Sequence, residues 1–93
     1  MRLTRHEVEV IKATILALDA GAKIYLFGSR ADDSKRGGDI DLLILSSKLS
    51  HRDKRAIRLA LHEQLGEQRI DILIARDTSR PLVRIALAEG VEL

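Results

Sequence analysis

The sequence predicts an α/β or α+β domain in which helices pack as a layer against a small sheet. Three segments carry apolar residues at helical spacing, and three short apolar runs have the length and composition of strands. In chain order the pattern is helix, strand, turn, strand, helix, strand, helix. Because 93 residues are enough for one modest core, we interpret residues 1–93 as a single domain.

The first helix is expected from about Arg5 to Ala20. Thr4 and Glu7 have the spacing of a capping box, and Gly21 suits the position just past the helix end. The apolar stripe of this helix consists of Val8, Ile11, Ile15 and Leu18. The first strand follows at Lys23 to Phe27. Its apolar residues fall on both faces, so we expect it to lie inside a layered structure.

The second strand is expected at Asp39 to Leu45. Residues two apart on a strand point to the same face, so two faces can be read directly. Asp39, Asp41, Leu43 and Leu45 share one face, and Ile40, Leu42 and Ile44 share the other. The Gly28-Ser29 step after the first strand allows a tight exit, with Ser29 as the cap of a helical turn over residues 30–33.

The next helix begins near Ser50 and Asp53 and ends near Gly66, with Ile57, Leu61 and Leu65 spaced by four. The third strand is expected at Arg69 to Ala75. The segment 46–68 is long enough for a helical crossover, so the second and third strands can lie side by side in parallel. That arrangement would bring Asp71 within reach of Asp39 and Asp41.

The last helix starts within Asp77 to Pro81 and ends at Gly90. Its inner stripe is predicted to consist of Leu82, Ile85 and Ala86. No structure is predicted for residues 91–93.

Composition excludes some classes of function. The 16 basic and 14 acidic residues leave a net charge of +2, which is too balanced for a nucleic-acid footprint. Tyr25 and Phe27 are the only aromatic residues, which disfavours a base-stacking platform. No cysteine is present for a disulfide or thiolate metal site. No apolar run has the length of a membrane helix, and the N-terminal sequence lacks the apolar segment of a signal peptide. We therefore expect a cytoplasmic protein.

The most informative stretch pairs Gly28-Ser29 with Asp39 and Asp41. On a strand, Asp39 and Asp41 would aim at one spot, with Cα atoms roughly 6.5 Å apart. Two carboxylates on a core-forming strand would repel each other and lose hydration. Mg²⁺ would relieve this cost, since it typically binds one or two carboxylates together with substrate phosphates.

This pattern resembles the nucleotidyltransferase superfamily that has the catalytic fold of DNA polymerase beta, and in particular its minimal members. The family signature is Gly-Ser, a spacer, Asp-x-Asp and a later third acid, which Asp71 supplies here. Nine residues separate Ser29 from Asp39, where ten are commoner in the family, and the shortening falls in the loop. The resemblance implies a mixed three-stranded sheet of the polymerase-beta palm type, with helices packed mainly on one face.

The resemblance also implies roles for the site residues. Gly28 and Ser29 would hold the triphosphate, and Arg30 would add a positive charge near it. Asp39 and Asp41 would bind two Mg²⁺ ions. Asp71 would deprotonate an acceptor hydroxyl and share a metal ion.

Free-standing minimal members of this superfamily resemble the antitoxins of two-gene modules whose partner is a helical HEPN-type ribonuclease. The implied reaction is transfer of AMP from ATP to a tyrosine hydroxyl of that partner. A non-catalytic protein that acts by contact alone is an alternative. Transfer to a small molecule such as an aminoglycoside is a third reading, although such enzymes carry an extra domain. A homo-oligomer is also compatible with so small a chain.

Each candidate residue has a plainer interpretation. Gly28-Ser29 could be a simple turn, and Arg30 could pair with Asp32 or Asp33. Asp39 could be a turn residue, and Asp41 could form a salt bridge at the strand end. The remaining alternatives are a salt bridge of Asp71 with Arg69 or Arg76, a solvated loop tip for Lys35 and Arg36, and surface positions for His6, His51 and His62.

Overall fold

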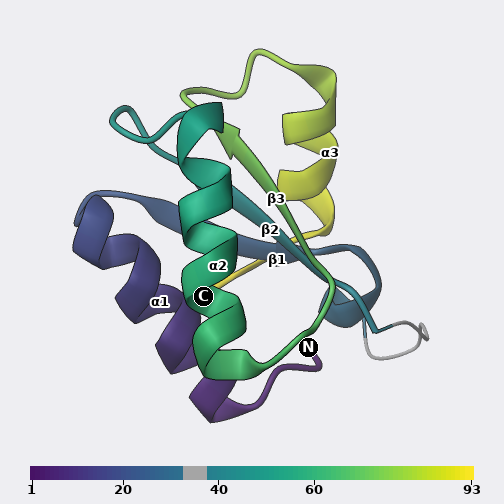
Figure 1. Ribbon diagram of the computed structural model, residues 1–93. Helices are drawn as coiled ribbons and strands as arrows, with labels where there is room; N and C mark the ends of the chain where they lie inside the picture. The colour runs from purple at the N-terminus through teal and green to yellow at the C-terminus, as the bar shows by residue number, and fades with distance from the viewer. Residues whose placement is uncertain (33–37) are drawn as a thin grey trace.

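The computed structural model describes residues 1–32 and 38–93 and has helices on both sides of a four-stranded mixed sheet (Figure 1). The predicted loop residues Lys35 and Arg36, together with Asp33, lie outside the described residues. The helices and strands are α1 (Arg5–Leu18), β1 (Lys23–Phe27), β2 (Ile40–Leu45), α2 (Lys54–Leu65), β3 (Ile70–Ala75), α3 (Pro81–Glu89) and β4 (Val91–Glu92). Two 3₁₀ turns, η1 (Gly28–Ala31) and η2 (His51–Asp53), precede β2 and α2.

The strand order is β3-β2-β1-β4. β2 pairs with β1 in antiparallel fashion and with β3 in parallel, so the predicted parallel neighbours are confirmed. The prediction of three strands is wrong, because residues 91–92 form β4 beside β1. A two-residue strand carries no alternating pattern that could reveal it in the sequence.

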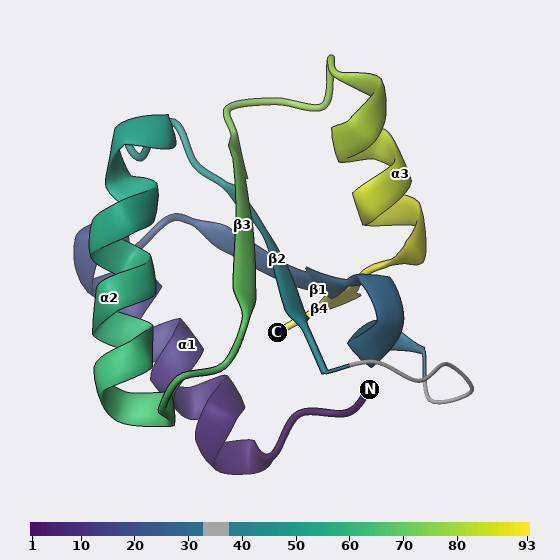
Figure 2. The same ribbon diagram turned by 45° about the vertical axis from the view of Figure 1, so that its right-hand side comes forward.

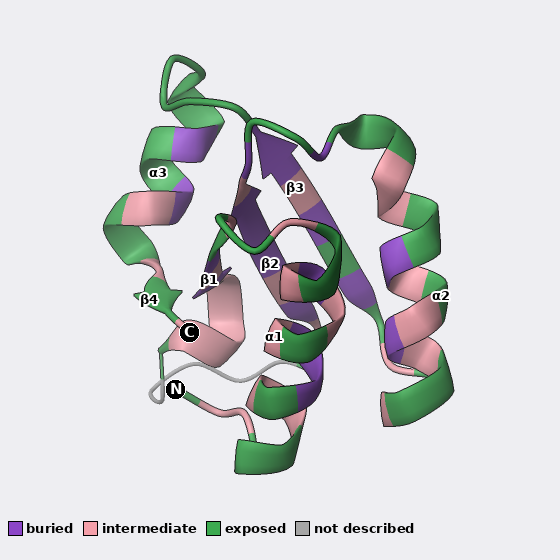
Figure 3. Ribbon diagram, turned by 90° about the vertical axis from the view of Figure 1, so that its left-hand side faces the viewer, coloured by how far each residue is buried: buried purple, intermediate pink, exposed green. Residues whose placement is uncertain are grey.

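Two apolar layers hold the sheet. α1 and α2 cover one face and α3 covers the other, as the edge-on view shows (Figure 2). The larger layer joins Val10, Ile11, Ile15, Ile57 and Leu61 of the helices to Ile24, Leu26, Ile40, Leu42, Ile44, Ile70, Ile72 and Ile74 of the strands. The buried residues therefore concentrate on the strands and on the inward sides of the helices (Figure 3). The two predicted faces of the second strand are confirmed.

The helix ends follow from local hydrogen bonds. Thr4 and Glu7 form the predicted capping box of α1, and Ser50 with Asp53 forms another before α2. α1 ends at Leu18 rather than Ala20, because Asp19 is extended and its carboxylate accepts the N–H of Gly21.

Two details of the prediction are wrong. Ser29 does not cap a turn over residues 30–33, since η1 begins at Gly28 and has no side-chain cap. In α3, Val83 and the predicted Ala86 are buried and Leu87 is half-buried, whereas the predicted Leu82 and Ile85 are 56% and 55% exposed. α3 is apolar nearly all round, so its periodicity allows more than one stripe.

β3 is an edge strand, and arginine side chains donate to two of its outward carbonyls. Ile40 and Ser46 of the β2 segment donate to the carbonyls of Arg69 and Ala75, so the even-numbered carbonyls of β3 face away from the sheet. Arg58 Nε donates to Ile70 O and Arg80 Nη2 to Ile74 O, both at 3.1 Å. Among the helices of the described residues, none is both long and apolar enough to cross a membrane.

Candidate active site

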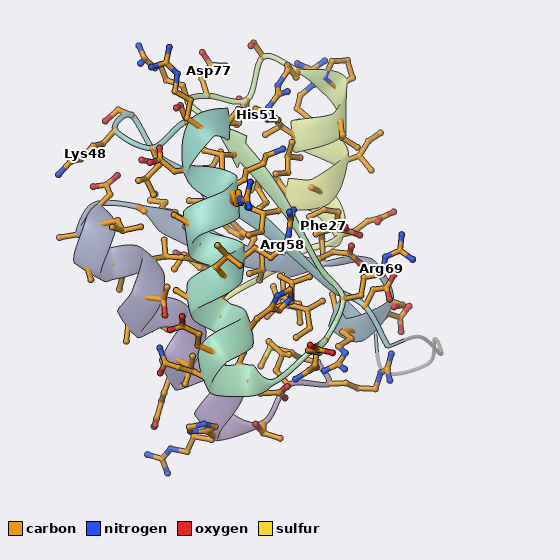
Figure 4. The ribbon with its side chains drawn as sticks, viewed as in Figure 1. Phe27, Lys48, His51, Arg58, Arg69 and Asp77 are labelled. Atoms are coloured by element: carbon orange, nitrogen blue, oxygen red, sulfur yellow. The ribbon has the colours of Figure 1, made fainter. Side chains whose placement is uncertain are left out.

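Two of the predicted acids lie side by side where β2 and β3 begin. Asp41 is the register partner of Asp71 in the parallel pair and of Phe27 in the antiparallel pair. All three residues are on the α3 face of the sheet, but α3 packs over Leu43 and Ala75 further along the strands. Asp41 is half-buried and Asp71 is exposed. Phe27 and Arg69 mark this end of the sheet in Figure 4, and Lys48 and His51 mark the other end.

The surroundings of Asp41 disfavour its charged form. Burial raises the pKa of Asp41, and the negative charges of Asp71 and Asp39 raise it further. A side-chain hydrogen bond with Asp71 acts in the same direction, and the positive charge of Arg69 only partly opposes these effects. The two carboxylates therefore lie close together at an electrostatic cost.

Gly28 is fitted against Asp41. Its φ of 72° is in the region that favours glycine. A Cβ added at Gly28 would overlap Asp41 Oδ2 and lie 3.1 Å from its Cγ. Glycine is therefore required both by the turn and by the approach of the carboxylate. The sequence indicated the turn, but nothing in it indicated this contact.

Asp39 has a different partner. It precedes β2, and its Oδ2 forms an ion pair with Arg69 Nε at 3.7 Å. The side chain of Asp39 is 46% exposed and that of Arg69 is 76% exposed, so the ion pair is a weak, solvated one. In residues 1–32 and 38–93, no group of three or more His, Cys, Asp or Glu side chains is arranged to hold a metal ion.

The donor chemistry at Asp41 and Asp71 fits a hard divalent cation. Carboxylate oxygens are the ligands that Mg²⁺ prefers, and one or two are usual when substrate phosphates complete its coordination. A cation would also relieve the repulsion that raises the pKa of Asp41. Asp41 and Asp71 are therefore the residues that would hold it, and Asp39 could join them only by leaving Arg69.

Ser29 is half-buried in η1, directly after β1. Its carbonyl accepts from Arg2 Nη2 at 3.3 Å, and the carbonyl of Arg30 accepts from the Arg2 N–H at 2.7 Å. The segment before α1 thus holds the turn that follows β1 in place. This turn and the two acids belong to the same end of the sheet, because Gly28 contacts Asp41.

Arg30 lies among protein groups. Its Nη2 donates to Gly38 O at 2.9 Å and to Gln68 Oε1 at 3.3 Å. Its Nη1 donates to Arg2 O at 3.4 Å and lies 3.7 Å from Glu7 Oε2. The sequence predicts Arg30 near the phosphates or, alternatively, beside Asp32 or Asp33, and Asp33 lies outside the described residues. The roles of Glu7 and Gln68 here had no signal in the sequence, apart from the capping pattern of Glu7.

Two of the three histidines are exposed, as expected: His6 and His51. His62 is half-buried, and its Nε2 lies 2.9 Å from the carbonyl of Gln68, whose side chain contacts Arg30.

Comparison with known proteins gives one clear match. A family model described as polymerase beta, nucleotidyltransferase matches residues 9–93 of the 93 residues. A search of curated proteins found no match. The family match covers nearly the whole chain and includes the Gly-Ser step and all three acids. The chain therefore belongs to the polymerase beta nucleotidyltransferase family.

Proposed function

We propose that the protein is a Mg²⁺-dependent nucleotidyltransferase that transfers AMP from ATP to a hydroxyl group of a partner protein. The partner would be a HEPN-type helical protein, with this chain as the antitoxin of the pair, acting in the cytoplasm. Membership of the family supports nucleotidyl transfer. ATP, Mg²⁺ and the partner are our inference from the site and from the resemblance to minimal nucleotidyltransferases.

One observation carries the proposal: Asp41 and Asp71 are partners across two parallel strands, with Gly28 against Asp41. The acids come from positions 30 residues apart in the sequence, and burial, together with the nearby charge of Asp71, raises the pKa of Asp41. A protein that used this face only for packing would gain nothing from such a pair. The pair is expected where a phosphate-bound cation has to be held.

The chain's own residues would divide the work as follows. Asp41 and Asp71 would hold the metal, joined by Asp39 once its carboxylate leaves Arg69, and bound Mg²⁺ supplies positive charge to the triphosphate and the leaving pyrophosphate. The Ser29 hydroxyl would donate to a terminal phosphate oxygen, and Gly28 keeps this turn close to Asp41.

Asp71 is the exposed member of the pair and is suited to meet an acceptor. It would take the proton of the acceptor hydroxyl, whose oxygen then bonds to the α-phosphorus. The bond from that phosphorus to the pyrophosphate oxygen breaks, and pyrophosphate leaves. Positioning and charge stabilisation supply most of the rate in such transfers.

A second candidate function is neutralisation of the partner by contact alone. The observation that favours it is the ion pair of Asp39 with Arg69, because it turns one expected metal ligand toward a cation of the chain. The exposed Leu82 and Ile85 of α3 would then serve as part of a contact surface. Transfer to a small molecule has no comparable observation in its favour.

The test is a labelling experiment with the whole protein, Mg²⁺, α-labelled ATP and lysate from its own source. We expect label on one protein band, no label from γ-labelled ATP, and loss of label with EDTA. Asp41→Asn and Asp71→Ala should abolish labelling. Asp77→Asn is the matched control, since Asp77 is an exposed acid beyond the far end of β3 (Figure 4), and it should label normally.

Three results would count against the proposal. Label that survives Asp71→Ala would remove the proposed base. No label, combined with a tight stoichiometric partner, would favour the contact function. A titration in which Mg²⁺-ATP fails to bind at millimolar concentration would refute the nucleotide site.

A further inference from the structure

Arg30 connects the two segments that lead into the acid-bearing strands. Its Nη2 donates both to the carbonyl of Gly38, at 2.9 Å, and to the side chain of Gln68, at 3.3 Å. Gly38 precedes Asp39 and β2, and Gln68 precedes Arg69 and β3. One guanidinium group therefore holds the starts of both strands.

The two acids depend on this junction. Asp41 lies three residues after Gly38, and Asp71 lies three residues after Gln68. The first bond of the parallel ladder runs from the N–H of Ile40 to the carbonyl of Arg69, at 2.9 Å. The link through Arg30 lies immediately before this bond. The hydrogen bonds of Arg30 therefore help to fix the position of β2 relative to β3 at the point where Asp41 lies beside Asp71.

The guanidinium is enclosed by protein groups. The Arg30 side chain is 17% exposed, and that of Glu7, its ion-pair partner, is 13% exposed. Gln68 also donates from Nε2 to Glu7 Oε2 at 3.2 Å, so Arg30, Gln68 and Glu7 form a closed triangle. Arg30 Nε is buried and has no hydrogen-bond partner among the described residues. The hydrogen bonds that the charged guanidinium donates from its terminal nitrogens are stronger and more directional than bonds between neutral groups.

We propose that Arg30 is a positioning residue that fixes Asp41 against Asp71, rather than a ligand of the nucleotide phosphates. This proposal rests on the proposed function of the site. Both terminal nitrogens of Arg30 are engaged with backbone and side-chain groups of three segments. To bind Arg30, a phosphate would have to displace these backbone and side-chain groups from the two nitrogens. Arg30 acts on the reaction through the carboxylates and does not touch the substrate.

The two roles predict different kinetics. A phosphate ligand contributes charge, so its loss weakens nucleotide binding and lysine partly restores it. A positioning residue contributes a forked geometry that lysine cannot reproduce. Its loss lowers the maximal rate and leaves nucleotide affinity nearly unchanged. Misplacement of catalytic groups by about 1 Å can cost about 100-fold in rate.

The experiment compares wild type with Arg30→Lys, Arg30→Gln and Gln68→Ala. The labelling rate in lysate is measured against ATP concentration, and Mg²⁺-ATP binding is measured by calorimetry. We expect the maximal rate to fall about 10- to 100-fold in both Arg30 variants, with a smaller fall in Gln68→Ala. The dissociation constant should change less than about threefold. Arg5→Gln is the matched control, because Arg5 is a highly exposed arginine of α1 that forms an ion pair with Glu9.

A second readout is independent of catalysis. Amide hydrogen exchange at Ile40, Asp41 and Asp71 should be about tenfold faster in Arg30→Lys, while exchange within α3 should not change. Nucleotide affinity that is lost in Arg30→Gln and recovered in Arg30→Lys would overturn the proposal, as would wild-type labelling by Arg30→Lys. If wild type labels nothing, the proposed function fails. Hydrogen exchange would still show whether Arg30 holds the two strands together.

Discussion

Replacing Gly28 by alanine tests the closest contact of the site. The φ of 72° costs a residue with a Cβ about 1–2 kcal/mol. The added Cβ also overlaps the Asp41 carboxylate, so the Asp41 side chain must leave its rotamer at a further cost of about 0.5–1.5 kcal/mol. We therefore expect Gly28→Ala to lower the free energy of unfolding by about 1.5–3.5 kcal/mol and to abolish labelling.

The other glycines separate these two contributions. Gly66 has a φ of 82° and a ψ of −176°, a region that is essentially restricted to glycine, with open space at its Cβ, so Gly66→Ala should cost only the backbone part, about 1–3 kcal/mol. Gly90 has an ordinary φ, but an added Cβ would lie 2.6 Å from the carbonyl oxygen of Ala86, which predicts a cost of about 1–3 kcal/mol. Gly38→Ala meets neither obstacle among the described residues and should change stability by less than about 0.5 kcal/mol.

Thermal unfolding and labelling measure the series together. For a domain of this size, each kcal/mol shifts Tm by about 4–8 °C. Both variants should unfold below wild type, but only Gly28→Ala should lose labelling while still folded at low temperature. If Gly28→Ala labels as well as Gly66→Ala does, the Asp41 carboxylate does not lie against Gly28, and our account of the site is wrong.

Three further variants test the charges and the core. Asp41→Asn should raise Tm at neutral pH, because the raised pKa of Asp41 means that its charged form destabilises the fold; the gain should disappear below about pH 4. Ser46→Ala should lower Tm most above about pH 4, because the Ser46 hydroxyl, which donates to the Asp19 carboxylate at 2.5 Å, lowers the pKa of Asp19. Leu42→Ala should cost about 2–5 kcal/mol, since Leu42 is fully buried, whereas Leu82→Ala should cost less than about 0.5 kcal/mol.

Each of these has a result that would contradict it. An Asp41→Asn variant that is less stable than wild type at neutral pH would mean that the charged Asp41 carboxylate does not destabilise the fold. A Tm difference for Ser46→Ala that is constant from pH 2 to pH 7 would show that the Asp19 bond does not contribute. Urea unfolding curves that are equal for Leu42→Ala and Leu82→Ala would mean that Leu42 is not buried in the core.

The three longer strands of the sheet, and the positions of two of the three acids on them, could be predicted from the sequence. The apolar runs and the length of the crossover were enough to place Asp41 and Asp71 on neighbouring parallel strands. The apolar runs are a local pattern, and the crossover length is a residue count, so both can be read directly from the sequence.

What could not be predicted depends on contacts between distant residues. Asp39 pairs with Arg69, and Arg30 is enclosed by Glu7 and Gln68. These contacts form only when segments that are distant in the sequence come together in the fold. The buried stripe of α3 was ambiguous because its apolar residues surround the helix. β4 was too short to carry a pattern, and it pairs with β1 only because α3 returns the chain to that edge.

The arginines along β3 affect how this protein can meet other chains. An uncovered edge strand of six residues offers a template onto which a strand of another molecule can add. Here Arg58 and Arg80 occupy two of the acceptors that such a strand would need, and they add positive charge along the row. Copies of this chain should therefore not pair strand to strand through β3, even at high concentration. Association is left to surfaces built from side chains, where recognition can be specific.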